Sequence, residues 1–287
     1  MLCYIYANCF GKDLKLYLEQ IPEFTNIYNE IHYFYVVDCV SKIDLEAIKN
    51  CKLFLYQHVS AEALKDNSGR NLDISQYTSD SLVRILPKDA ITISFPSPYF
   101  TAYFPYGVTL KDIPNENLRN QYPDHFPGYC FNRNLLEKLL QKEAPQEIAN
   151  YLNNPTLYSR EEILKNVSTT FSNLEYREIK NRIDIPLSGF IRRNYKFKRL
   201  FHTTNHPTKI IFEYVIERIL SILNIPHSEI ILPFDNMMKY ARVPILSCVK
   251  RALELPENED FNGSIYVNGI EIYSLFQYVK FYSDLFS

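Results

Sequence analysis

The chain has 287 residues, of which 46% are hydrophobic and 22% charged, which predicts a packed globular protein rather than a disordered one. Its net charge of −2 argues against a general nucleic-acid binder, which normally carries a basic surplus. No run of residues approaches the roughly 20 apolar positions of a membrane span, and no secretory signal is recognisable. The 6 cysteines are scattered and form no C-x-x-C pair, so we expect no metal site. Together these features predict a soluble, cytoplasmic protein.

The first hundred residues alternate apolar runs with segments of helical spacing. The apolar runs predict four strands, at Leu2–Asn8, His32–Val40, Cys51–Val59 and Ala90–Phe95. The segments between them predict helices at Lys12–Gln20, Ile43–Lys49 and Asp80–Leu86. Nearly continuous apolar strands separated by helices are typical of a parallel sheet that is covered on both faces.

Polar residues and a cysteine, which could bind a ligand or take part in a reaction, follow three of these strands. Asn8 and Cys9 come after the first, Gln57 and His58 close the third, and residues 94–99 end the fourth. Because the carboxyl ends of parallel strands meet at one edge of the sheet, these groups should lie together where open α/β sheets bind ligands.

The rest of the chain predicts an ordered aromatic loop region over residues 96–127, followed by helices. These helices are expected at Leu135–Leu140, Gln146–Leu152, Glu161–Arg182 and from Pro207 to about Leu223. We therefore predict an α/β catalytic core over residues 1–224. A small helical subdomain over residues 225–287 should pack on it and end in Ile272–Phe286.

Cys9 leaves a strand and is followed by Gly11 and a helix. A thiol at a helix N-terminus meets exposed backbone N–H groups and the positive end of the helix dipole, which favour the thiolate. The same N–H groups could stabilise an oxyanion on an attacked carbonyl. The alternative is a buried, inert cysteine, which is common in intracellular proteins.

His206 lies in the segment Phe-His-Thr-Thr-Asn-His-Pro-Thr, directly before a predicted helix. The following proline holds the histidine on a rigid loop, as a general base requires, although a capping or core histidine is equally compatible. Thr203 and Asn205 offer hydrogen bonds to this loop. His202 could support a metal site only weakly, since no carboxylate or cysteine lies close in sequence.

A basic segment precedes this histidine loop and is interleaved with aromatic residues. Its five cations are Arg192, Arg193, Lys196, Lys198 and Arg199. In a chain of net charge −2 such a cluster indicates either a local anion site or a solvated surface. No Walker or dinucleotide glycine pattern occurs, so neither nucleotide hydrolysis nor hydride transfer is supported.

Four motifs together resemble the WcbI family of capsular polysaccharide biosynthesis proteins. They are Ala7–Gly11, Tyr56–Gln57, Pro96–Phe100 with Tyr103 and Pro105, and Phe201–Pro207, and the similarity continues to Val243–Ile245. The resemblance implies a fold akin to the SGNH/GDSL hydrolases, with a cysteine in place of the nucleophilic serine. It also implies coenzyme A binding and O-acetylation of a capsule sugar.

The resemblance implies roles for specific residues. Cys9 would be the nucleophile and His206 the general base. The oxyanion and substrate contacts would come from Asn8, Gly11, Gln57, Tyr99, Tyr103 and Asn205. The basic segment Arg192–Arg199 would bind the phosphates of coenzyme A.

The sequence departs from the expected pattern at three positions. Thr203 stands where the hydrolases carry an acid, so the third member of a triad is not identified and a Cys–His dyad is expected. Phe10 stands where the family suggests Gln, and His58 where it suggests Pro. Both differences bear on substrate choice and on oxyanion contacts.

The main hypothesis is therefore an O-acetyltransferase that uses acetyl-CoA and a sugar, nucleotide-sugar or polysaccharide acceptor, without a metal. Either Cys9 carries the acetyl group, or His206 activates the acceptor directly. A hydrolase, acting as an esterase or deacetylase through the same residues, is the first alternative. A non-catalytic protein that binds coenzyme A or a glycan is the second. The basic segment favours a coenzyme A protein, because a hydrolase has no need of it.

Overall fold

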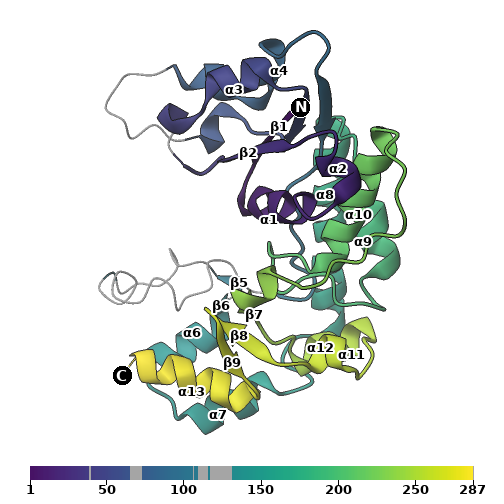
Figure 1. Cartoon of the computed structure of the whole chain (residues 1–287). Coiled ribbons are helices and arrows are strands. Elements are labelled where there is room, and N and C mark those ends of the chain that lie inside the picture. Colours follow the sequence, from purple (N-terminus) through teal and green to yellow (C-terminus); the bar gives the residue numbers. More distant parts are fainter. Residues whose placement is uncertain (39, 65–72, 106, 109–115, 117–130, 287) are drawn as a thin grey trace. The chain divides into compact units, whose positions relative to one another are not determined.

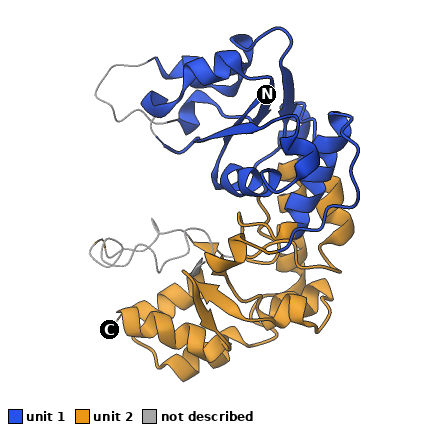
Figure 2. Ribbon diagram, viewed as in Figure 1, with its two compact units in different colours: residues 1–98, 175–187, 210–233 blue, residues 99–174, 188–209, 234–287 orange. Residues whose placement is uncertain are grey.

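The computed structural model describes residues 1–38, 40–64, 73–105, 107–108, 116 and 131–286 (Figure 1). The chain forms two compact units, and each is assembled from three separate stretches (Figure 2). Unit 1 contains residues 1–98, 175–187 and 210–233, and unit 2 contains residues 99–174, 188–209 and 234–287. This interleaved division differs from the single boundary after residue 224 that the sequence suggests.

The centre of unit 1 is a four-stranded parallel sheet with the order β2-β1-β3-β4. Its strands are β1 (Leu2–Ala7), β2 (Glu30–Tyr35), β3 (Leu53–Tyr56) and β4 (Ile91–Ser94). The predicted α/β fold with a parallel sheet flanked by helices is confirmed. The observed β2 and β3 end earlier than predicted, because the chain turns away at Asp38, whose N–H bonds to the carbonyl of Tyr35, and leaves β3 at Gln57.

Helices cover both faces of this sheet (Figure 1). They are α1 (Cys9–Leu18), α2 (Pro22–Thr25), α3 (Leu45–Asn50), α4 (Ser79–Arg84) and most of α10 (Lys209–Ile222). On one face Tyr6 packs with Ile48 of α3 and Leu82 of α4 in a buried cluster. On the other face Phe10 of α1 stacks on Phe212 of α10, with ring centroids 4.3 Å apart. Successive side chains of a strand point to opposite faces of the sheet. Because helices cover both faces, nearly every residue of β1 is part of the core.

The strand order creates a topological switch point between β1 and β3. The chain moves from β1 to β2 on one side and then returns to build β3 and β4 on the other. In open α/β sheets, ligands bind outside the carboxyl ends of the two strands at such a point. Asn8 follows β1 and Gln57 follows β3, so both lie at this position, as the sequence predicts.

Unit 2 combines helices with two short antiparallel sheets. Its helices are α6 (Arg133–Leu140), α7 (Pro145–Leu152), α9 (Ser188–Asn194), α11 (Ser247–Leu253), α12 (Glu259–Asn262) and α13 (Leu275–Phe286). Its strands are β5 (Gly107–Val108), β6 (Phe131–Asn132), β7 (Ala241–Arg242), β8 (Ile265–Val267) and β9 (Ile270–Ile272). The long α8 (Arg160–Lys180) contributes residues to both units.

The C-terminal segment differs from the predicted helical subdomain, because β7, β8 and β9 form a three-stranded antiparallel sheet within it. Asn268 and Gly269 connect β8 to β9 and have φ angles of 46° and 80°. Asn-Gly is the preferred pair for a two-residue hairpin turn with positive φ. The sequence therefore carried a signal for this hairpin that the helical interpretation overlooked.

An aromatic core in unit 2 supports the segment that carries His206. The ring of Phe100 stacks on Phe201, with centroids 5.2 Å apart, and meets Phe171 and Tyr195 edge-on. Phe100 and Phe201 are both fully buried.

Among the described residues, no helix has the length and apolar character needed to cross a bilayer.

Gly11 provides a test of how tightly α1 packs on β1. A Cβ atom at this position would lie 2.7 Å from Ala7 Cβ and 2.7 Å from Tyr33 Cε2. We expect Gly11→Ala to lower the free energy of unfolding by on the order of 1 kcal/mol in urea denaturation, because overpacking outweighs the better helix propensity of alanine. Gly189→Ala is the matched helical control, since its Cβ would come no closer than 3.5 Å to Arg193. Equal stability changes in the two variants would contradict the packing argument.

Candidate functional site

Asn8 organises the switch-point edge of unit 1. Its side-chain oxygen accepts from the N–H of Phe10 at 3.0 Å and so caps α1, while its backbone N–H donates to Gln57 Oε1 at 2.9 Å. Its side-chain amide donates to Ser97 Oγ at 2.8 Å, and its carbonyl accepts from the Tyr33 hydroxyl at 2.8 Å. The ends of β1 and β3 and the segment after β4 are thereby joined, as predicted. Ser97 lies within residues 94–99, which the sequence places at this edge, although it is not among the expected substrate contacts.

Cys9 is the first residue of α1, and its side chain is half-buried. Burial and the negative charge of Asp13 raise the pKa of the Cys9 thiol, and the backbone N–H groups of Cys9 and Phe10 only partly oppose this. The thiol is therefore protonated near pH 7. The expectation that the helix N-terminus would favour a thiolate is wrong for the resting protein, because desolvation outweighs the helix start.

The backbone donors at the start of α1 are already engaged. Phe10 N–H bonds to the side chain of Asn8, and Gly11 N–H bonds to the Asn8 carbonyl at 2.9 Å. Gly11 is required here for the close approach of α1 to Ala7 and Tyr33, rather than as a ligand. The predicted oxyanion role of these N–H groups would require their present bonds to break. Gln57 is buried, and its Oε1 is likewise occupied by Asn8.

A carboxylate that the sequence analysis did not identify lies at the end of β4. Asp184 accepts from the N–H of Ser94 at 2.8 Å and from its hydroxyl at 2.7 Å. It fixes the strand end from which the segment with Ser97 departs.

In unit 2, residues 201–207 form a tight turn that we call the His206 loop. Phe201 and Pro207 form an antiparallel bridge at its base, and His202 N–H donates to the His206 carbonyl at 2.8 Å. Within the loop, Thr203 Oγ1 accepts from the N–H of His206 at 3.1 Å. At its tip, the Thr204 carbonyl accepts from the N–H of Phe100 at 2.7 Å, which docks the loop on the aromatic core.

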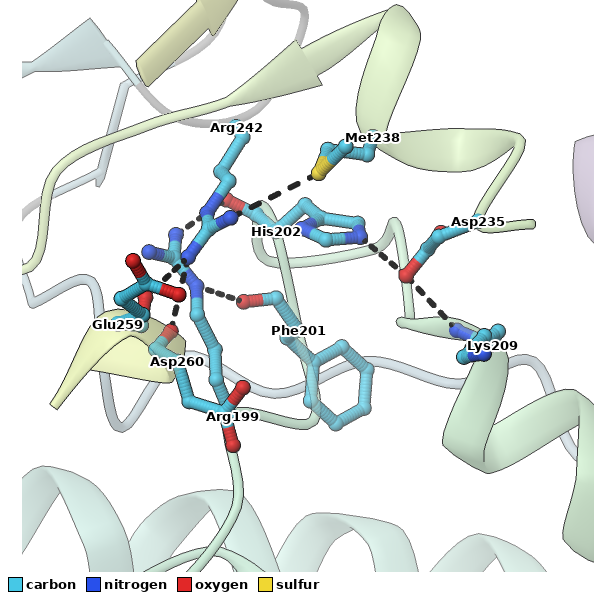
Figure 3. Close-up of polar contacts among 9 residues, drawn as sticks. All are labelled: Arg199, Phe201, His202, Lys209, Asp235, Met238, Arg242, Glu259 and Asp260. Atoms are coloured by element: carbon cyan, nitrogen blue, oxygen red, sulfur yellow. Dashed lines mark hydrogen bonds and ion pairs between the residues drawn. The ribbon is translucent and has the colours of Figure 1, made fainter. Parts of the chain in front are cut away.

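His202 is held by a carboxylate that lies 33 positions later in the chain (Figure 3). Its Nε2 lies 2.9 Å from Asp235 Oδ2, and the same oxygen accepts from the backbone N–H of Lys209 at 3.0 Å. Burial opposes ionisation of Asp235, but the hydrogen bonds from His202 and from the backbone N–H groups of Lys209 and Met238 outweigh it, so its pKa is lowered. Burial lowers the pKa of His202 despite Asp235. His202 is therefore a neutral imidazole that donates from Nε2.

His206 is half-buried, and its environment keeps the imidazole uncharged. Burial, and to a smaller extent His202, lower its pKa to about 4, so the imidazole is neutral at pH 7. Its Nδ1 is shielded from solvent and has no hydrogen-bond partner among the described residues. Beside it, Asn205 is half-buried and accepts from the Thr203 hydroxyl at 3.1 Å.

Tyr103 does not contact substrate in the way the sequence suggests. It is 1% exposed, and its hydroxyl donates to the carbonyls of Tyr195 and Lys198. It therefore belongs to the aromatic core of unit 2. Tyr99, by contrast, is 39% exposed and remains a candidate for ligand contact.

Arg199 also has a different role from the predicted one, because it is 4% exposed. Its guanidinium donates to the carbonyls of Phe201 at 3.0 Å, His202 at 3.2 Å and Val243 at 2.6 Å. These bonds connect the base of the His206 loop to the residue after β7. Arg199 is thus a structural cation and not a surface ligand for phosphate.

The other four cations of the basic segment lie nearer the surface of unit 2. Arg192, Arg193 and Lys198 are exposed, and Arg192 packs its guanidinium over the Phe171 ring at 4.2 Å. Lys196 is half-buried and lies 3.8 Å from Glu254. In the described part of the chain, no group of three or more His, Cys, Asp or Glu side chains is arranged to hold a metal ion.

The parallel sheet with polar groups at its switch point is typical of α/β proteins that bind a ligand at the carboxyl ends of their strands. Comparison with known proteins identifies the family. The family model described as "Polysaccharide biosynthesis enzyme WcbI" matches residues 2–228. The chain therefore belongs to the WcbI family of polysaccharide biosynthesis enzymes, and the resemblance given by its motifs is confirmed.

One similar solved structure is a WcbI protein, described as the native form without a disulfide bond between coenzyme A and a cysteine. It shares 21% sequence identity with this chain, and the match covers 99% of this chain and 88% of the other, with a TM-score of 0.75. At this identity the likeness establishes the fold. No curated protein sequence matches the chain significantly. Cys9 belongs to unit 1 and His206 to unit 2, and their pairing stays a prediction.

The low pKa of His206 predicts a pH dependence of stability. The ordinary histidine pKa is 6.5 and the folded value is about 4, so the unfolded chain binds more protons between these limits. The stability linked to neutral His206 is complete above pH 6.5 and is lost as the pH falls towards 4. We expect calorimetric unfolding temperatures to fall over this range, and to fall less steeply in His206→Gln. The control His32→Gln leaves residues 201–207 unchanged and should keep the wild-type dependence of unfolding temperature on pH. If His206→Gln also kept that dependence, the lowered pKa of His206 would be refuted.

Proposed function

We propose that the protein is a coenzyme A-dependent O-acetyltransferase that modifies a sugar of a bacterial capsular or surface polysaccharide. Acetyl-CoA would be the donor, and a hydroxyl of a sugar, nucleotide-sugar or polysaccharide the acceptor. The observation that carries this proposal is the placement of Cys9 at the switch-point edge of a WcbI-family fold. The related WcbI structure is described in terms of coenzyme A and a cysteine, and we propose Cys9 as the counterpart of that residue.

In the proposed reaction His206 accepts a proton. Its lowered pKa keeps the imidazole neutral throughout the neutral range, so no proton must leave it before the reaction begins. In a covalent route, Cys9 sulfur attacks the acetyl carbonyl, and the thiol proton passes to His206 and then to the departing sulfur, so that coenzyme A leaves as the thiol. The acceptor hydroxyl then attacks the acetyl-cysteine, and its proton passes through His206 to the Cys9 sulfur, which restores the free thiol.

In a direct route, His206 takes the proton of the acceptor hydroxyl, which attacks the acetyl carbonyl of acetyl-CoA. His206 then gives this proton to the departing sulfur, so coenzyme A leaves as the thiol, and Cys9 only lines the site. The raised pKa of Cys9 favours this route, because the thiolate is the reactive nucleophile and is scarce in the resting protein near pH 7. We therefore propose direct transfer as the main route.

The phosphates of coenzyme A would meet the exposed part of the basic segment. Arg192 and Arg193 can form bidentate contacts with phosphate oxygens, and Lys196 and Lys198 add positive charge. Arg199 takes no part, because carbonyl groups already occupy its guanidinium.

Two other functions use the same residues differently. An esterase or deacetylase would replace the sugar acceptor with water, but such an enzyme has no use for a phosphate-binding segment. A non-catalytic protein that binds coenzyme A or a glycan is compatible with the protonated, half-buried Cys9, since binding requires no thiolate, but the family to which the chain belongs is one of enzymes. Calorimetry with acetyl-CoA separates the hydrolase from acetyl transfer, and His206→Ala separates the non-catalytic protein from both enzymes.

Calorimetric titration with acetyl-CoA tests the donor. We expect binding that weakens as salt rises, because exposed charges are screened. The charge reversal of both Arg193 and Lys198 to Glu should raise the Kd at least tenfold, since two favourable phosphate contacts become repulsive. Lys280→Glu on α13 changes an exposed cation outside the segment and is the matched control. Absence of binding at millimolar acetyl-CoA would overturn the proposed donor.

Transfer assays with Cys9 and His206 variants test the route. For direct transfer, His206→Ala should lower kcat by roughly 10²- to 10⁴-fold, the usual contribution of a general base. Cys9→Ala should retain most activity, and mass spectrometry after acetyl-CoA exposure should find no acetyl adduct on Cys9. An adduct of about 42 Da would instead establish the covalent route. Full activity in both variants would show that the proposed centre is wrong.

A further inference from the structure

Asp235 contacts the chain on both sides of His206. Its Oδ2 accepts from His202 Nε2 at 2.9 Å and from the backbone N–H of Lys209 at 3.0 Å (Figure 3). His202 lies before His206 in the chain, and Lys209 lies after it as the first residue of α10. One carboxylate oxygen therefore ties together the two ends of the segment that carries His206.

The loop itself passes this constraint on to His206. The N–H of His202 bonds to the carbonyl of His206, and the N–H of His206 bonds to Thr203 Oγ1. Both backbone polar groups of His206 are thus bonded to residues next to the anchored imidazole. A displacement of His202 would move the His206 backbone with it.

Burial makes the anchor stiff. The side chain of His202 is 3% exposed and that of Asp235 is 16% exposed, so neither can exchange its partner for bulk water without cost. The positive charges of Arg199 and Arg242 disfavour a protonated His202, whereas Asp235 favours it, and burial decides for the neutral ring. The ionised carboxylate then fixes the proton on Nε2 and with it the orientation of the imidazole.

We propose that Asp235 is a positioning residue for His206: through the His202 side chain and the first residue of α10, it holds the His206 loop in the conformation that presents the His206 imidazole to substrate. The part of His206 in the reaction rests on the proposed function. In a catalytic triad the acid contacts the base itself. Here the acid contacts the frame of the loop, and residue 235 lies beyond residues 2–228 that match the family model.

Two variants of His202, each with an amide side chain, test the contact between His202 and Asp235. In His202→Gln the side-chain Nε2 can still reach Asp235, whereas in His202→Asn the shorter amide cannot. Asp235→Asn removes the carboxylate, and Asp284→Asn on α13 is a control at an exposed aspartate. Should Asp235→Asn fail to fold, the two His202 variants decide the question.

The first measurement is the NMR titration of His206, which needs no substrate. The chain has 6 histidines, and His206→Gln identifies the resonance of interest. We expect a midpoint near 4 in the wild type and in Asp284→Asn. In His202→Gln it should rise only slightly, because the smaller contribution of His202 to the lowered pKa is lost while the loop stays in place. In His202→Asn and Asp235→Asn it should rise by about one pH unit or more towards the ordinary value, because the released imidazole meets water. A role confined to folding would lower the unfolding temperature and leave this midpoint unchanged, which would overturn the proposal.

The second measurement is acetyl-transfer kinetics. We expect His202→Asn and Asp235→Asn to lower kcat on the order of 10²-fold, as a misplaced catalytic group does, with the KM for acetyl-CoA unchanged. His202→Gln should stay within a few-fold of the wild type. If the wild type transfers no acetyl group while the NMR shifts occur, the proposed function fails and the positioning of His206 stands. If the wild type is active and Asp235→Asn and His202→Asn are equally active, the positioning fails alone.

Discussion

Each hydrogen-bonding group of Asn8 is engaged by a different part of unit 1. Its N–H bonds to Gln57, its carbonyl to Tyr33, and its two amide atoms to Ser97 and Phe10. These bonds join β1, β2, β3, the segment after β4 and the start of α1 at a single residue. Because Cys9 is the next residue, the position of its thiol follows from the same set of bonds. Any change at Asn8 would therefore affect the strand edge and the thiol together.

Burial sets the protonation of both proposed catalytic groups, in opposite directions. It raises the pKa of Cys9 and lowers that of His206, so both are uncharged near neutral pH. A neutral His206 suits a reaction in which it takes the proton of the acceptor hydroxyl as the acyl group is transferred. A preformed thiolate–imidazolium ion pair is not the resting state that these environments favour.

Apolar runs and helical spacing in the sequence predict the strands and helices whose formation depends on neighbouring residues. The apolar runs located the four strands of unit 1, and their ends placed Asn8 and Gln57 at one edge. The roles that the family resemblance implies for Tyr103 and Arg199 differ from those in the structure, where backbone carbonyls occupy both side chains. Nothing nearby in sequence shows this, since Val243, a partner of Arg199, is 44 positions away. The contact between His202 and Asp235 was equally hidden. The Asn268–Gly269 pair, by contrast, is a local hairpin signal, and in the structure it outweighs the helical spacing of the C-terminal segment.

The environment of Cys9 has a consequence for the durability of the protein. Peroxides and disulfides react with thiolates far faster than with thiols, and susceptibility to oxidation follows thiolate character and exposure. A half-buried thiol with a raised pKa, close to the carboxylate of Asp13, is therefore shielded from oxidative damage while the site is empty. The burial that keeps the Cys9 thiol protonated therefore also slows its oxidation.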